Sequence, residues 1–140
     1  MTTASMTTLL ADAAEAGTAV GAFNVIHLES AEAIATGAEA AGRPVIMQIS
    51  ENCVRYHGAL APIALATRAI ADAAEAPVAL HLDHATDTAL VDEALELQNA
   101  TAFGLTGGLH SLDEEEIERW TEAVEVGNAY VNRHITGAIV

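Results

Sequence analysis

PVALHLDH, residues 77–84, is the stretch of sequence that decides the fold. Its first six residues form a near-continuous apolar run, as expected of a strand that is buried on both faces of a parallel sheet. The run includes His81 and is followed by Asp83 and His84. Ligands in parallel α/β folds bind where strands end, so this stretch predicts both a buried strand and the position of a site.

The segments before this stretch repeat its pattern. Ala19–Ile26 and Pro44–Ile49 are apolar runs that predict two further buried strands, whereas residues 50–58 are polar and irregular. Helical spacing predicts helices between the strands, over Met6–Ala16, Ser30–Ala41, Pro62–Ala76 and Asp87–Leu97. Such alternation predicts parallel strands. Doubly wound sheets and (β/α)₈ barrels both begin this way, and periodicity does not separate them.

The character of the chain changes after about Gln98. Asn99–Gly108 is rich in Gly and Thr, Asp113–Val124 predicts an acidic helix, and Gly127–Val131 predicts a strand. Ser111 or Asp113 is the expected N-cap of the acidic helix. The sequence therefore predicts a short α/β segment at the C-terminal end.

The charge of the chain excludes several functions. Asp and Glu number 20 against five Arg and no Lys, which gives a formal net charge of −15. This charge repels phosphate backbones and anionic lipid, so we expect neither nucleic-acid nor membrane partners. Without Lys no Schiff base can form with a carbonyl substrate. A metal or neutral hydrogen-bond donors must then activate any such substrate.

The location expected from the sequence is the cytoplasm. The single Cys53 forms no internal disulfide, which suits a reducing compartment. The first 16 residues contain no basic region followed by an apolar stretch, so we expect no secretion signal.

Polar side chains stand at the ends of all three predicted strands. Asn24 lies in the first, Ser50 follows the second, and Asp83 and His84 end the third. Asp83 and His84 can converge only if the strand ends near Leu82 and the backbone turns, because successive side chains of a strand alternate in direction. The alternative interpretation is that these residues are polar strand ends that cap the following helices.

Three motifs, GAFNV (residues 21–25), PVIMQIS (44–50) and HLDHA (81–85), resemble the first three strands of the class II ketose-bisphosphate aldolases, over about residues 6–97. The resemblance implies the N-terminal part of a (β/α)₈ TIM barrel, about three βα units. It implies Zn²⁺ at the carboxyl rim, with His84 as a ligand and Asp83 as the catalytic acid–base group. Asn24 and Ser50 would line the site for a phosphorylated ketose.

Cleavage of a carbon–carbon bond beside a ketone generates an enediolate, whose charge a divalent metal can hold in a chain without Lys. The family's later zinc-binding His residues and phosphate-binding loops find no match here. His27, His57, His110 and His134 show no matching spacing, and a catalytic zinc usually has three protein ligands. We therefore expect an incomplete barrel with weak or absent turnover on its own.

The last part of the chain resembles a different family. NATAFGLTGGLHS (residues 99–111), GNAYVNR (127–133) and ITGA (135–138) are similar to glutamate-semialdehyde (pyrroline-5-carboxylate) dehydrogenases. In that resemblance Gly137 and Ala138 would hold a substrate carboxylate, although the catalytic Cys and the NAD-binding domain are absent. The predicted organisation is a partial aldolase barrel over residues 1–95 and a dehydrogenase-like segment of different origin over residues 96–140.

Three functional hypotheses follow. The first is an aldolase module that acts on a ketose bisphosphate and whose open sheet edges could be covered by self-association, as a homo-oligomer. The second is a non-catalytic remnant or interaction module. The third is a dehydrogenase-related fragment.

Overall fold

The computed structural model describes residues 4–100, 106–109 and 111–132. The chain divides into two compact units, Met1–Thr86 and Asp87–Val140. Gly137 and Ala138, to which the sequence assigned a carboxylate-binding role, lie outside the described residues, as do His110 and His134. Among the described residues, no helix has both the length and the apolar character that a membrane crossing requires.

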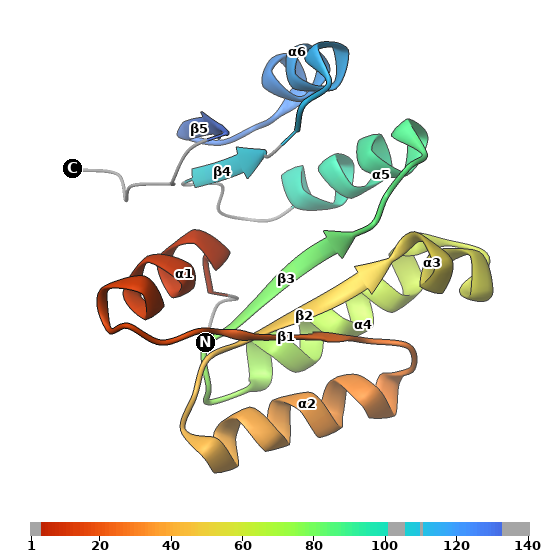
Figure 1. Ribbon diagram of the computed structural model, residues 1–140. Helices are drawn as coiled ribbons and strands as arrows, with labels where there is room; N and C mark the ends of the chain where they lie inside the picture. Colours follow the sequence, from red (N-terminus) through yellow and green to blue (C-terminus); the bar gives the residue numbers. More distant parts are fainter. Residues whose placement is uncertain (1–3, 101–105, 110, 133–140) are drawn as a thin grey trace. The chain divides into compact units, whose positions relative to one another are not determined.

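The first unit is a three-stranded parallel sheet with helices on both faces (Figure 1). Its strands lie in the order β1-β2-β3. Its elements, in chain order, are α1 (Met6–Glu15), β1 (Gly21–Asn24), α2 (Leu28–Ala41), β2 (Val45–Ser50), α3 (Glu51–His57), α4 (Leu60–Ala73) and β3 (Val78–Asp83).

One face of the sheet packs under α2 and α4, which lie side by side (Figure 1). Val45, Met47 and Ile49 alternate along β2 and are all buried, Met47 completely. The buried face of α2 consists of small residues, Ala31, Ala35 and Ala38 among them, and small side chains let the helix approach the sheet closely. This face therefore forms a continuous apolar layer.

The opposite face has two different halves. At the amino ends of the strands, Leu9 of α1 packs against Ile46 and Ala79 in a buried cluster. Because side chains alternate along a strand, Gln48 and His81, two residues farther along, lie on this same face. Apolar packing under α1 thus gives way to polar side chains toward the carboxyl ends.

Most predicted elements of this unit are confirmed, with two corrections. β1 was predicted to be buried, but all four of its residues are exposed. Within the described residues β1 pairs only with β2, so its outer edge gains no cover from a neighbouring strand. The polar, irregular stretch 50–58 contains helix α3, because Ser50 caps its first turn and Gly58 ends it with a φ of 83°.

The second unit contains α5 (Thr88–Asn99), β4 (Thr106–Leu109), α6 (Glu114–Ala123) and β5 (Asn128–Val131). β4 and β5 pair in parallel, and Trp120 of α6 is buried. Asp87 and Asp113 are the N-caps of the two helices, and Asp113 is one of the two caps that the sequence offered for the second. β4 was not predicted, because its sequence Thr-Gly-Gly-Leu has little of the apolar or β-branched character that marks a strand.

Candidate active site

The candidate site lies on the α1 face of the first unit, at the carboxyl end of its sheet. Asn24, Gln48 and His81 stand opposite one another across the three strands. Two residues farther along β2 and β3, Ser50 stands opposite Asp83. Paired residues of parallel strands project to the same side, so the register brings the side chains predicted from the strand ends to one face.

The backbone turns sharply after Asp83, as the sequence interpretation required. His84 has a φ of 51°, in the left-handed region that residues with a Cβ rarely adopt. This turn brings Nε2 of His84 to 3.7 Å from Oδ2 of Asp83. The Asp83 side chain is 16% exposed and that of His84 is 86% exposed, so a shielded carboxylate stands beside an imidazole that is open to solvent.

His81 and Gln48 form a second polar pair on the same face. Nε2 of Gln48 lies 3.1 Å from Nδ1 of His81. An amide nitrogen can only donate, so Nδ1 accepts and carries no proton. Burial lowers the pKa of His81 below its ordinary value of 6.5; the Asp83 carboxylate raises it and His84 lowers it, both more weakly. The contact with Gln48 and the lowered pKa both favour the neutral form of His81.

Ser50 and Asn24 differ in how firmly they are held. The Ser50 hydroxyl accepts a hydrogen bond from the backbone N–H of Cys53 at 3.3 Å, which caps α3. Asn24 is exposed at the end of β1, where the next residue, Val25, donates its N–H to the carbonyl of Gln48 at 2.8 Å. The capping interpretation of Ser50 is therefore correct for its hydroxyl, while its position opposite Asp83 also places it at the site.

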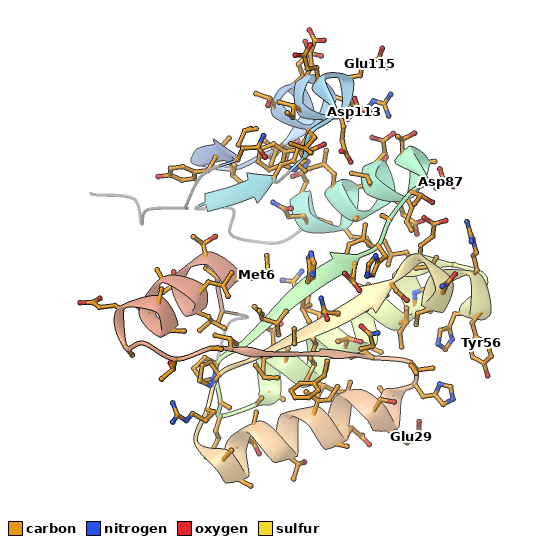
Figure 2. The ribbon with its side chains drawn as sticks, viewed as in Figure 1. Met6, Glu29, Tyr56, Asp87, Asp113 and Glu115 are labelled. Carbon is orange, nitrogen blue, oxygen red and sulfur yellow. The ribbon has the colours of Figure 1, made fainter. Side chains whose placement is uncertain are left out.

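Helix α3 connects this site to the loop after β1. The ring nitrogen Nε2 of His57 lies 2.6 Å from the carbonyl oxygen of Ile26, and the Cys53 thiol donates to the same oxygen at 3.9 Å. The His27 ring stacks on that of Tyr56, with centroids 5.7 Å apart. Figure 2 shows Tyr56 on α3 at the same end of the unit as Glu29, near the start of α2.

Sequence reasoning missed Glu51, which lies directly after Ser50. Its side chain is buried, and it accepts hydrogen bonds from the backbone N–H and the hydroxyl of Thr86. It also pairs with Arg55, one helical turn away. The spacing of Glu51 and Arg55 in the sequence was a signal of that ion pair, but nothing in the sequence indicated the contact with Thr86.

Cys53 has no sign of a nucleophilic role. Burial raises the pKa of its thiol above the ordinary value, which suppresses the reactive thiolate near neutral pH. The thiol contributes packing beneath α3 and the weak contact with Ile26.

The described residues contain no group of three or more His, Cys, Asp and Glu side chains that could hold a metal ion. Asp83 and His84 provide one carboxylate and one imidazole. A catalytic zinc usually has three protein ligands, so this pair alone does not fit a complete zinc centre.

A groove of about 880 Å³ lies elsewhere in the first unit. It runs between α1, β1 and α2, and its lining, which includes Leu9, Phe23 and Ile34, is mostly apolar. None of Asn24, Ser50, Asp83 and His84 lines it. The groove is thus separate from the polar face and borders the open edge of β1.

Comparison with known proteins identifies the family. Residues 4–130 match the family described as "Fructose-bisphosphate aldolase class-II". The chain belongs to the class II fructose-bisphosphate aldolase family.

Individual relatives agree with this membership. A protein of Bacillus subtilis (strain 168) described as a fructose-bisphosphate aldolase is 41% identical over 66 residues, which are 47% of this chain and 23% of that protein. A solved candidate fructose-1,6-biphosphate aldolase from Coccidioides immitis superposes with a TM-score of 0.62 at 25% identity, over 89% of this chain and 50% of that one. The matches thus span 23% and 50% of the length of these relatives, and the fold class of the chain is that of the aldolase barrel.

A second kind of relative corresponds to the other resemblance in the sequence. The bifunctional protein PutA of Rhizobium meliloti is 48% identical over 40 residues, which are 29% of this chain and 3% of that protein. The aldolase family match extends to residue 130, past the end of the resemblance seen in the sequence. The boundary at residues 95 and 96 between parts of different origin stays a prediction.

The lowered pKa of His81 predicts a pH dependence of stability. His81 binds a proton less readily in the folded protein than in the unfolded chain, because burial lowers its pKa. Its contribution to the free energy of unfolding is therefore complete above its ordinary pKa of 6.5 and is lost as the pH falls through the lowered value. We expect the free energy of unfolding to drop less in His81→Gln than in the wild type between about pH 7.5 and about pH 5. Urea titrations of both proteins in the same buffers measure this, and equal drops would contradict it.

Proposed function

We propose that this protein takes part in the reversible aldol cleavage of a ketose bisphosphate, with Asp83 as the catalytic acid–base group. One observation carries the proposal: the left-handed turn at His84 puts an imidazole beside the Asp83 carboxylate at the carboxyl end of a parallel strand. Family membership supports the reaction class. Asn24 and Ser50, which the register brings to the same face, are proposed to line the substrate site.

The chemistry assigned to Asp83 is a proton transfer. In the cleavage direction its carboxylate takes the proton of the hydroxyl on the carbon that becomes the aldehyde. The C–O bond becomes a carbonyl, the neighbouring C–C bond breaks, and its electron pair stays on the ketone-derived half as an enediolate. A carboxylate that is 16% exposed is open enough to meet a hydroxyl and shielded enough to exchange its proton with the substrate.

His84 is proposed as one zinc ligand, since its imidazole is solvent-exposed and the family is generally zinc-dependent. The described residues stop short of a full ligand set. Residues outside the described ranges, or a second chain, would have to complete it. We infer that the chain turns over weakly on its own, and the incomplete ligand set equally favours the alternative of a non-catalytic module.

Removal of the carboxylate tests the catalytic assignment. We expect Asp83→Asn to lower zinc-supplemented cleavage of a ketose bisphosphate by a factor of about 10²–10⁴, because general acid–base catalysis contributes about this much. The release of triose phosphate is measured by a coupled assay. Asp92→Asn is the matched control, since Asp92 is an exposed carboxylate that pairs with Arg119 in the second unit.

Two results would count against the proposal. An Asp83→Asn variant as active as the wild type would remove Asp83 from the mechanism. A wild-type chain with no turnover at any zinc concentration would favour the non-catalytic module. Turnover at the rate of a full-length aldolase would refute our inference that the chain is weakly active alone.

Metal analysis tests the role of His84. If further ligands complete the site as proposed, zinc bound per chain after dialysis should approach one in the wild type and fall to near zero in His84→Ala, which loses the imidazole ligand. His27→Ala is the control, because its exposed imidazole stacks on Tyr56 instead of facing Asp83. Equal zinc in wild type and His84→Ala would exclude His84 as a ligand.

The open edge of β1 supports a proposal about assembly. Within the described residues β1 has a strand on one side only, and the apolar groove runs beside it. An exposed strand edge presents free backbone groups that pair readily with another strand. We infer that a second copy covers this edge. The charge of −15 on each chain opposes association at low salt, so added salt should strengthen it.

Self-association is tested at Phe23, on β1. We expect Phe23→Glu to abolish a dimer measured by light scattering, because it adds a charge to the apolar edge. Leu65→Glu is the matched control: both residues are 54% exposed, but Leu65 lies on α4 and does not line the groove. A wild-type monomer at all salt concentrations, or a dimer unaffected by Phe23→Glu, would contradict the inference.

The remaining proposals follow from the sequence. We infer a cytoplasmic location from the single, buried Cys53, which needs no oxidising compartment. A relation to pyrroline-5-carboxylate dehydrogenase is kept as the last alternative, since its match is with 3% of PutA. Binding of NAD or of glutamate would favour that alternative.

A further inference from the structure

Glu51 is a buried carboxylate that the proposed chemistry does not use. Glu51 is 5% exposed and lies at the junction between β2 and α3. An ionised carboxylate in such a place is costly unless hydrogen bonds and opposite charge compensate it. The position of a buried carboxylate is therefore dictated by its partners, and these indicate its role.

The two oxygens of Glu51 serve different parts of the unit. Oε1 pairs with the guanidinium of Arg55, within the same short helix. Oε2 accepts the backbone N–H of Thr86 and, at 2.9 Å, its hydroxyl. Glu51 thus links the end of β2 to a residue that is 35 positions later in the chain.

Thr86 is two residues beyond His84, so this link fixes the far side of the turn that carries the site. The near side is fixed by the pairing of β3 with β2 up to Asp83. Between these anchors, His84 adopts a φ of 51°, which costs conformational energy for a residue with a Cβ. Strained residues of this kind persist only where the surrounding structure holds them.

We propose that Glu51 is a positioning residue, which holds the turn at residues 84–86 so that the imidazole of His84 stays beside the carboxylate of Asp83. Its meaning for catalysis rests on the proposed function, whereas its effect on the turn does not. Charged acceptors form stronger hydrogen bonds than neutral ones. An ionised Glu51 is therefore better suited to hold the turn than the isosteric amide.

The test uses the metal-free protein and the variant Glu51→Gln. The amide group keeps the shape of the side chain, but it replaces an acceptor with a donor toward either Arg55 or Thr86. We expect hydrogen exchange at the Thr86 amide to speed up by about tenfold. The φ of His84, measured by NMR scalar couplings, should leave the left-handed region in part of the molecules. Amides in the centre of β2 should keep their protection.

Two further variants sharpen the result. Thr86→Val removes only the hydroxyl bond, so we expect a smaller acceleration, about threefold. If Glu51→Gln fails to fold, hydrogen exchange at residue 86 in Thr86→Val tests the positioning role instead. Glu39→Gln is the matched control, since the Glu39 carboxylate accepts the N–H of Glu75 at 2.9 Å, in the loop before β3. It should leave exchange at Thr86 unchanged.

The outcomes separate this inference from the proposed function. Unchanged exchange at Thr86 and an unchanged φ of His84 in Glu51→Gln would overturn the positioning role. A uniform loss of protection across the sheet would also overturn it, because it would show that Glu51 stabilises the whole unit. A wild-type chain without zinc or turnover would instead reject the proposed function, and the exchange result would stand.

Discussion

The in-register parallel pairing of β1, β2 and β3 is the constraint on which the rest of the structure depends. It directs Val45, Met47 and Ile49 toward α2 and α4. It directs Gln48, His81 and Asp83 to the other face. A slip by one residue would exchange these faces, because side chains alternate with a period of two. Polar groups would then be buried without partners, so the packing of the core and the composition of the site are set by the same register.

The sequence was sufficient for the order of the three strands of the first unit and of the helices between them, apart from α3, and for the polar face of its sheet. Long apolar runs separated by amphipathic segments have few solutions other than parallel strands joined by helices. The sequence offered Ser111 or Asp113 as the N-cap of the acidic helix, and the structure shows Asp113; capping can be narrowed in this way because it depends on local chemistry. The sequence also set a condition for the convergence of Asp83 and His84, a strand that ends near Leu82 followed by a turn of the backbone. In the structure β3 ends at Asp83 and the turn follows at His84.

The features that the sequence did not reveal depend on contacts between distant residues. The exposure of β1 reflects its place at the edge of the sheet, where, in the part of the chain that the structure describes, it has β2 on one side and no strand on the other; its apolar residues could not indicate this. Helix α3 forms in a polar stretch because its ends are capped and its side chains reach Ile26 and Thr86. The burial of Glu51 has the same origin. Periodicity reports only the neighbours within a few residues, so it carries no information on such contacts.

At His84 the backbone conformation lowers stability, while the side chain is the one to which we assign a ligand role. A left-handed residue with a Cβ costs roughly 1–2 kcal/mol, a cost that glycine avoids. Selection for heat resistance alone would therefore favour glycine at position 84 and discard the imidazole. The proposed role of the imidazole would be lost with that substitution. Libraries built to screen this chain for thermostability should therefore leave position 84 unchanged.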